Sequence, residues 1–189
     1  MSNEDLLSES ITTWIDLLQN RQDNEALDLY CEKIIPALIP RLQHRFHTTY
    51  NQTGNYDGLV SLLGFTPETV ALAYHFTRPQ KFVVLYTEDT AHLLSKVLKY
   101  TRVIPSAFFH EPFSEQPSTD IYRALDLALK RFPKDYRIAL ELTGGKKTMG
   151  GALAVAAGVL NIDLLYIDYE KYMPEFRKPR PESTYIHLV

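Results

Sequence analysis

Short apolar runs alternate with segments of helical periodicity from residue 59 to the C-terminus, and this alternation restricts the possible folds more than any other feature. The runs are apolar on both faces and helical segments separate them, which is typical of a parallel sheet covered on both sides. The predicted strands are residues 59–64, 82–86, 103–109, 138–142, 164–167 and 184–189, and the predicted helices are 67–76, 91–100, 118–132 and 152–158. We therefore expect an α/β fold with a Rossmann-like, doubly wound and mainly parallel sheet of about six strands, the last of them at an edge.

The first 50 residues have a different character, because they show helical periodicity without a strand pattern. Pro36 and Pro40 interrupt the second of two helical patterns there and predict a kink or a break. Residues 47–55 are polar and aperiodic and are predicted to be a linker. The sequence thus predicts a helical extension at 1–50 and an α/β ligand-binding domain at 58–189.

Composition excludes several classes of protein. With 45% hydrophobic residues the chain is globular, and its formal net charge of −3 is unlike that of proteins that bind nucleic acid non-specifically. Cys31 is the single cysteine, which excludes an intrachain disulfide and suits a reducing cytoplasm. The N-terminus lacks a signal-peptide pattern, and no apolar run approaches the roughly 20 residues that cross a bilayer. We expect a soluble cytoplasmic protein that binds no duplex nucleic acid and holds any polyanion in a local cluster of positive charge.

Residues 140–151, LELTGGKKTMGG, are the most informative stretch of the chain for function. A buried-strand pattern ends at Thr143, a glycine pair and a lysine pair follow, and a helix of small residues comes next. A strand that enters a helix through a glycine-rich turn presents backbone N–H groups at the positive end of the helix, which is an anion site. Lys146 and Lys147 add positive charge, so we expect a ligand that carries phosphate. The alternative is a tight turn with two solvated lysines.

Two common nucleotide motifs are excluded. A Walker-type phosphate loop requires Ser or Thr directly after its Gly-Lys pair, but Lys147 follows Lys146 here. No G-x-G-x-x-G pattern follows the first predicted strand, so a dinucleotide-dependent dehydrogenase is not supported. His75, His92 and His110 lack the spacing of metal ligands, and we expect neither a metal nor a cofactor.

Ligands of doubly wound sheets gather at the carboxyl ends of strands, where the prediction places two further loops. The loop at 64–68 follows the first strand, and its Thr66 and Pro67 suit the N-cap and the first position of a helix. The loop at 87–90 follows the second strand. These loops add Gly64, Thr87 and Glu88 to the candidate ligand-binding residues. Each loop also has a plainer interpretation, since Thr66 can simply start a helix and Glu88 can serve as an acid in a first helical turn.

A basic tract lies between the fifth and sixth predicted strands. It contains Lys171, Arg177, Lys178 and Arg180. Two interpretations fit it equally, a flap over an anionic ligand and a plain surface loop.

Three parts of this chain resemble the CRISPR-associated Rossmann fold (CARF) family. Residues 64–70 (GFTPETV) resemble its first signature, and residues 142–149 (LTGGKKTM) resemble its second. Residues 166–169 with 177–179 resemble its downstream portion, in the correct order and spacing. The resemblance implies a homodimeric sensor of type III CRISPR antiviral defence, which binds a cyclic oligoadenylate second messenger, such as cyclic tetra- or hexa-adenylate, across the dimer two-fold.

The resemblance also implies which residues contact the ligand. It assigns Phe65 and Thr66 to the first ligand loop. To the second it assigns Thr143, Gly144, Gly145, Lys146, Lys147 and Met149. Residues 1–50 lie outside the resemblance, and we expect them to serve in dimerisation or signal relay, or to be part of a longer protein. If that longer protein has a membrane-spanning helix outside residues 1–189, we expect it to be membrane-associated.

Two other activities remain open on the sequence. A metal-independent ring nuclease would cleave the cyclic ligand, with Lys146 or Lys147 stabilising the developing charge and Thr66 or Thr143 positioning the ring. No histidine is well placed as a general base, so fast turnover is not expected and a non-catalytic sensor is favoured. The other activity is that of an unrelated domain which binds monomeric nucleotides such as ATP or AMP.

Overall fold

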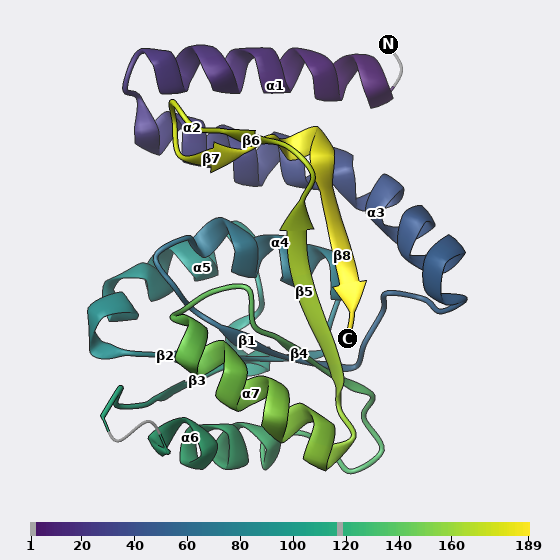
Figure 1. The fold of residues 1–189 in the computed structure, drawn as a ribbon, viewed down its shortest axis with the longest axis vertical. Helices are drawn as coiled ribbons and strands as arrows, with labels where there is room; N and C mark the ends of the chain where they lie inside the picture. Colours follow the sequence, from purple (N-terminus) through teal and green to yellow (C-terminus); the bar gives the residue numbers. More distant parts are fainter. Residues whose placement is uncertain (1–2, 117–118) are drawn as a thin grey trace. The chain divides into compact units, whose positions relative to one another are not determined.

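The chain forms two compact units, each described here by itself (Figure 1). The computed structural model describes residues 3–116 and 119–189. The helical unit comprises Met1–Gly54 and Ile167–Ile186, and the sheet unit comprises Asn55–Tyr166 and His187–Val189. Most of the segment after residue 166, which the sequence assigned to the α/β domain, therefore groups with the N-terminal helices.

The sheet has six strands in the order β3-β2-β1-β4-β5-β8. Their bounds are β1 Gly58–Leu62, β2 Lys81–Tyr86, β3 Phe108–Pro112, β4 Ile138–Glu141, β5 Asp163–Tyr169 and β8 Thr184–Leu188. Strand β1 lies parallel to its neighbours β2 and β4, and the pairs β2–β3 and β4–β5 are also parallel. The predicted α/β fold with a mainly parallel sheet is thus confirmed, and β8 lies at the edge, as expected.

The strand order reverses at β1. The chain moves outward from β1 to β2 and β3, and then returns to place β4 on the other side of β1. In the register of the parallel pair β1–β4, Ser61 lies opposite Glu141. The carboxyl ends of β1 and β4 are therefore neighbours at a topological switch point, which is where open α/β sheets form ligand crevices.

Helices α4 and α5 cover one face of the sheet, and α6 and α7 cover the other (Figure 1). Their bounds are α4 Pro67–Thr77, α5 Leu94–Thr101, α6 Asp120–Leu129 and α7 Lys147–Leu160. On the α6–α7 face, Val60 of β1 belongs to the same buried cluster as Ile121 and Leu153. Because both faces are covered, the run 82–85 is buried at every position, which explains its continuous apolar sequence. Residue 118, the first of the predicted helix 118–132, lies outside the described residues.

Two predicted boundaries are wrong by several residues. Strand β3 starts at Phe108 instead of residue 103, because Pro105–Ala107 forms a 3₁₀ turn. The proline of that turn has no N–H to donate to a strand ladder. The predicted helix at 91–100 lies partly in a second 3₁₀ turn, Glu88–Leu93, and becomes α-helical only at α5.

The helical unit begins with α1 Asn3–Gln19 and α2 Asp23–Leu29, followed by the π-helical segment Tyr30–Ile34 and by α3 Ile35–Tyr50. Pro36 lies in the first turn of α3, where its missing N–H is tolerated, and Pro40 lies inside the helix. The predicted break is thus a change of helix type just before the prolines. The predicted linker at 47–55 is wrong in its first part, because α3 continues to Tyr50 and ends at Asn51, whose φ is 53°.

A small antiparallel hairpin within residues 167–186 was not predicted. It consists of β6 Tyr172–Met173 and β7 Lys178–Pro179. Strand β5 ends and β8 begins within the helical unit, which explains why the segment between them belongs there. The basic tract lies in and around this hairpin, where Arg180 forms an ion pair of 2.7 Å with Glu182.

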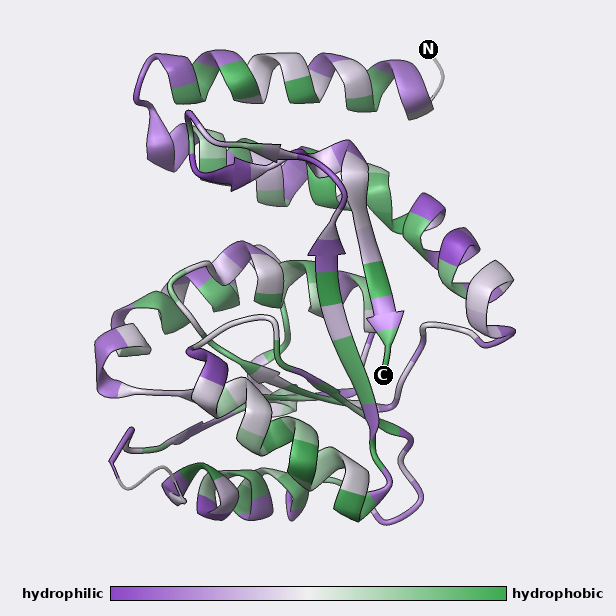
Figure 2. Ribbon diagram, viewed as in Figure 1, coloured by the Kyte–Doolittle hydropathy of each residue, from purple (hydrophilic) through white to green (hydrophobic). Residues whose placement is uncertain are grey.

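Hydrophobic residues dominate helix α7 after its first turn, whereas α1 alternates between hydrophilic and hydrophobic positions (Figure 2). Over residues 3–116 and 119–189, no helix has both the length and the apolar character that a membrane span requires.

Candidate functional site

The loops that follow β1 and β4 touch each other through glycine backbone. A Cβ atom on Gly144 would lie 2.2 Å from the carbonyl oxygen of Leu62 and 2.7 Å from the backbone nitrogen of Gly64. A Cβ atom on Gly64 would lie 2.5 Å from the backbone nitrogen of Gly145. Only glycine fits approaches this close, so Gly64 and Gly144 bring the two predicted ligand loops into backbone contact at the switch point.

Residues 143–147 form a turn that we call the lysine elbow. Gly145 has a φ of 81°, in the left-handed region that glycine adopts without strain. Lys146 is extended at the N-cap of α7, and Lys147 is the first residue of this helix of 14 residues. Both lysines are exposed. The positive end of a long helix and two ammonium groups therefore meet in one place, an arrangement that favours anions.

Met149 supports the elbow from the interior. Its side chain is 8% exposed and belongs to the core cluster. Its Sδ lies 3.5 Å from the backbone nitrogen of Lys146, which donates a weak hydrogen bond to it. The structure thus places this candidate ligand-binding residue beneath the elbow.

The loop after β1 presents an aromatic ring and a hydroxyl group to solvent. Phe65 is 71% exposed. Thr66 is exposed and occupies the N-cap position of α4, but its side chain makes no capping hydrogen bond. Instead, the Thr66 carbonyl oxygen accepts a hydrogen bond of 2.8 Å from the Thr69 hydroxyl. The Thr66 hydroxyl is therefore not used to cap the helix.

A buried carboxylate, Glu141, lies directly below both loops. Its side chain is fully buried at the end of β4. The Ser61 hydroxyl donates a short hydrogen bond to it, and the Thr143 backbone N–H donates another of 2.6 Å. Burial raises the pKa of Glu141, while the hydrogen bonds from Ser61 and Thr143 act in the opposite direction. This residue was missed on the sequence, where an acidic residue inside an apolar strand was the available signal.

The ends of β2 and β3 enclose a cavity of about 590 Å³ next to the elbow. This volume lies within the range of about 300–1,000 Å³ that is usual for small-molecule sites. The lining includes Thr87, Glu88 and Asp89 from one loop and Phe113 and Glu115 from the other. Thr87 is buried, and its backbone N–H donates to the Thr90 hydroxyl (3.2 Å), so this candidate residue shapes the turn.

The elbow and the cavity meet at an ion pair between Lys146 and Glu115. The Lys146 Nζ atom lies in direct contact with the Glu115 carboxylate. Glu115 belongs to the loop after β3 and also lines the cavity. No sequence pattern singled out Glu115, since it lies 31 residues from its partner.

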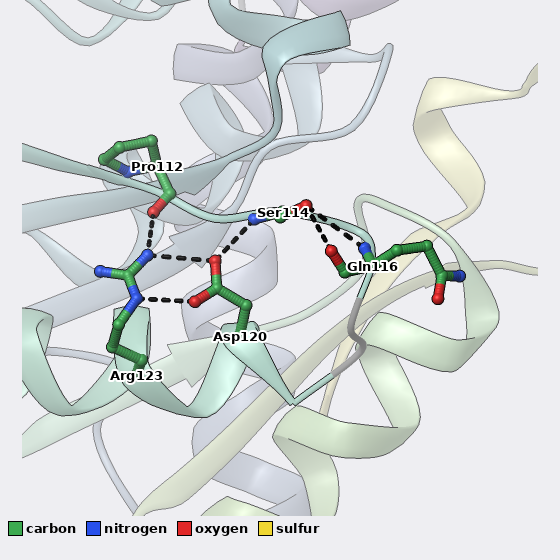
Figure 3. Close-up of polar contacts among 5 residues, drawn as sticks. All are labelled: Pro112, Ser114, Gln116, Asp120 and Arg123. Carbon is green, nitrogen blue, oxygen red and sulfur yellow. Dashed lines mark hydrogen bonds and ion pairs between the residues drawn. The ribbon is translucent and has the colours of Figure 1, made fainter.

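The loop that carries Glu115 is held in place by the start of α6 (Figure 3). The Ser114 backbone N–H donates to Asp120 (2.7 Å), and Arg123 donates both to Asp120 (2.6 Å) and to the Pro112 carbonyl oxygen (3.0 Å). The Ser114 hydroxyl also donates to the Gln116 carbonyl oxygen (2.8 Å). The hydrogen bonds from Arg123 and then from Ser114 lower the pKa of Asp120 to about 2, so its carboxylate stays ionised in this network.

Comparison with known proteins bears on this geometry. No protein-family model matches the chain. The chain is 29% identical over 166 residues to the CRISPR system endoribonuclease Csm6 of Thermus thermophilus, a match that covers 85% of this chain and 35% of that protein. The structure of Can2 from Sulfobacillus thermosulfidooxidans, solved with cyclic tetra-adenylate, matches with a TM-score of 0.50 at 23% identity. This match covers 59% of the present chain and 32% of Can2.

These two matches support a CARF-type domain in this chain. The chain spans about a third of the length of each of these two proteins. In the sheet unit, the loops at 64–66 and 143–147 adjoin at the switch point, whereas Thr87 and Glu88 belong to the neighbouring cavity. Among residues 3–116 and 119–189, no cluster of three potential metal ligands is present.

Proposed function

We propose that this CARF-type domain binds a cyclic oligoadenylate, with ring phosphates at the lysine elbow. The observation that carries the proposal is the backbone contact between the loops after β1 and β4, which places Lys146 and Lys147 at the positive end of α7 beside the exposed Phe65 and Thr66. Phosphate is favoured there by the helix terminus and by the ammonium groups. The Can2 structure, which holds cyclic tetra-adenylate, supports this choice of ligand class.

The neighbouring cavity takes the sugar and base of the same ligand. Its carboxylates, from Glu88, Asp89 and Glu115, disfavour a second phosphate but accept hydrogen bonds from ribose hydroxyls and from the amino group of adenine. Phe113 adds an aromatic surface to the lining. An acidic cavity beside a basic elbow therefore suits a nucleotide, whose charge is confined to its phosphate.

A second copy of the chain completes the site by packing against α7. After Lys147 this helix has no charged residue, and Figure 2 shows hydrophobic residues along its length. Val155, Val159 and Leu160 are 63%, 81% and 49% exposed, which is unusual for three apolar side chains of one helix. The exposed surface starts at the elbow, so an isologous dimer through α7 would bring two elbows to one ring.

The helical unit relays the binding event. Strand β5 begins in the sheet unit and ends in the helical unit, as residues 163–166 and 167–169 belong to different units. The elbow follows β4, which pairs with β5, so a rearrangement at the elbow reaches that unit along β5. Csm6 is a CRISPR endoribonuclease, and we place the present chain in the same kind of cytoplasmic antiviral signalling, with the output supplied by a longer protein or by a partner.

Equilibrium binding with product analysis tests the proposal. Purified protein is titrated with cyclic tetra-adenylate, cyclic hexa-adenylate and AMP, and the same samples are then separated by chromatography. We expect a cyclic ring to bind with one ring per two chains and to remain intact. Linear products would assign a ring nuclease that uses Lys146, Lys147 and Thr66 instead. Equal affinity for AMP, or no binding of either ring, would contradict the proposal.

A further inference from the structure

We propose that Glu115 is a specificity determinant of the ligand site, which rejects phosphate anions that lack a nucleoside. This inference rests on the proposed function, because it assigns a role at the same site. Glu115 forms an ion pair with the ammonium group of Lys146. A ligand phosphate takes over Lys146, and the Glu115 carboxylate then accepts a hydrogen bond from the sugar or base in the cavity.

The first part of the argument is the ion pair itself. Glu115 contacts the Lys146 ammonium group, and the side chains are 31% and 60% exposed. The Glu115 carboxylate therefore competes with an incoming anion for the ammonium group of Lys146. An exposed ion pair of this kind lowers the affinity of a competing anion by about two- to fivefold.

The second part is the hydrogen bonding of the chain next to Glu115. Asp120 accepts hydrogen bonds from the Ser114 backbone and from Arg123, and Arg123 also binds the Pro112 carbonyl oxygen (Figure 3). These contacts hold the backbone just before Glu115, whose side chain contacts Lys146. Because the Glu115 carboxylate is tethered beside Lys146, it competes for this lysine at a high effective concentration. Inorganic anions at low concentration therefore do not displace it readily.

The third part is the position of Glu115 in the cavity wall. The residue lines the cavity of about 590 Å³ together with Glu88 and Asp89. Once phosphate has engaged Lys146, a carboxylate without a donor would be electrostatically unfavourable beside two other acids. Ribose hydroxyls and the adenine amino group supply that donor. Only a ligand with both phosphate and nucleoside compensates for the lost ion pair.

The test compares tripolyphosphate with a cyclic oligoadenylate on wild type and Glu115→Ala. We expect the variant to bind tripolyphosphate about two- to fivefold more tightly, because the competing carboxylate is gone. We expect it to bind the ring roughly tenfold more weakly, because an acceptor of charge-assisted hydrogen bonds is lost. A role confined to folding would shift both affinities in the same direction.

Two further variants sharpen the result. Glu115→Gln removes the charge but keeps a carbonyl acceptor, so tripolyphosphate binding should rise while ring binding stays within about twofold of wild type. Asp126→Ala also removes one negative charge from the sheet unit, at an exposed ion pair between Asp126 of α6 and Lys130, and should leave both affinities unchanged. Affinities that change in parallel, or not at all, in Glu115→Ala would overturn the inference. Failure of wild type to bind either ring would instead contradict the proposed function, and the tripolyphosphate result would still test the ion pair.

Discussion

The hydroxyl of Ser61 in β1 donates a hydrogen bond to the fully buried carboxylate of Glu141 in the neighbouring strand β4. The same carboxylate accepts the backbone N–H of Thr143, the first residue of the lysine elbow. The Glu141 side chain therefore links β1 and β4, the strands that precede the two ligand loops, to the first residue of the elbow. This places an ionisable group with a raised pKa at the base of the site.

Glu141→Gln should make stability less dependent on pH. Burial raises the pKa of Glu141 above its ordinary value of 4.5, so its contribution to stability is fully present below pH 4.5 and is lost as pH rises through the raised pKa. Glutamine stays neutral, accepts from Thr143 and donates to Ser61. The melting temperature of the variant relative to wild type should therefore increase between pH 5 and pH 8, as followed by thermal denaturation. A constant difference across this range would show that Glu141 does not titrate there.

Lys146→Ala and Lys147→Ala should each weaken ring binding by about tenfold or more, since each removes a charge-assisted contact with phosphate. Both substitutions should also reduce the salt dependence of binding. Because the two side chains are exposed, the free energy of unfolding should change by no more than about 0.5 kcal/mol. Titrations at several salt concentrations and denaturant melts measure these quantities.

Lys134→Ala is the matched control for the lysine variants. This exposed lysine precedes β4 and so lies toward the amino end of the strand, away from the elbow. Its replacement should leave ring affinity within about twofold of wild type. If Lys146→Ala mainly unfolds the protein, the lysine is structural and the site assignment is wrong.

Gly144→Ala should destabilise the fold and abolish ring binding together. Its Cβ atom would meet the backbone of Leu62 and Gly64 at 2.2 Å and 2.7 Å, and backbone atoms cannot move aside as a flexible side chain does. We expect a loss of about 1–3 kcal/mol in the free energy of unfolding, measured by denaturant titration. Gly150→Ala is the control, since its Cβ atom would make only ordinary contacts at 3.6 Å and beyond. An unchanged stability of Gly144→Ala would contradict the close packing of the two loops.

Val159→Glu should dissociate the proposed dimer. Val159 is 81% exposed on α7, so in an isolated chain the substitution is tolerated, whereas a charge buried between two copies is strongly unfavourable. Sedimentation velocity should show a shift from dimer to monomer, with the melting temperature of the monomer unchanged. Leu98→Glu, at another exposed apolar position on α5, should leave the dimer intact. A dimer that persists in Val159→Glu would place the interface elsewhere.

Local sequence patterns predicted the class of fold and the position of the elbow. Apolar runs such as 82–85 have the periodicity of strands buried on both faces, and the structure has β2 there. The Gly144–Gly145 pair predicted a tight turn before α7, because a turn of this kind needs residues without a Cβ atom. Errors occurred where turn chemistry overrode periodicity, as at Pro105, which delays the start of β3.

The Ser61–Glu141 hydrogen bond joins residues 80 positions apart, and the Lys146–Glu115 ion pair joins residues 31 positions apart. No local pattern encodes such contacts, because they depend on which strands become neighbours and on where each loop points. The sequence by itself thus determined the strand and helix periodicities and the turn chemistry of the elbow, which are properties of adjacent residues. Only the tertiary structure decided which carboxylates face that elbow and that most of the segment after residue 166 joins the helical unit, because these follow from strand order and side-chain packing.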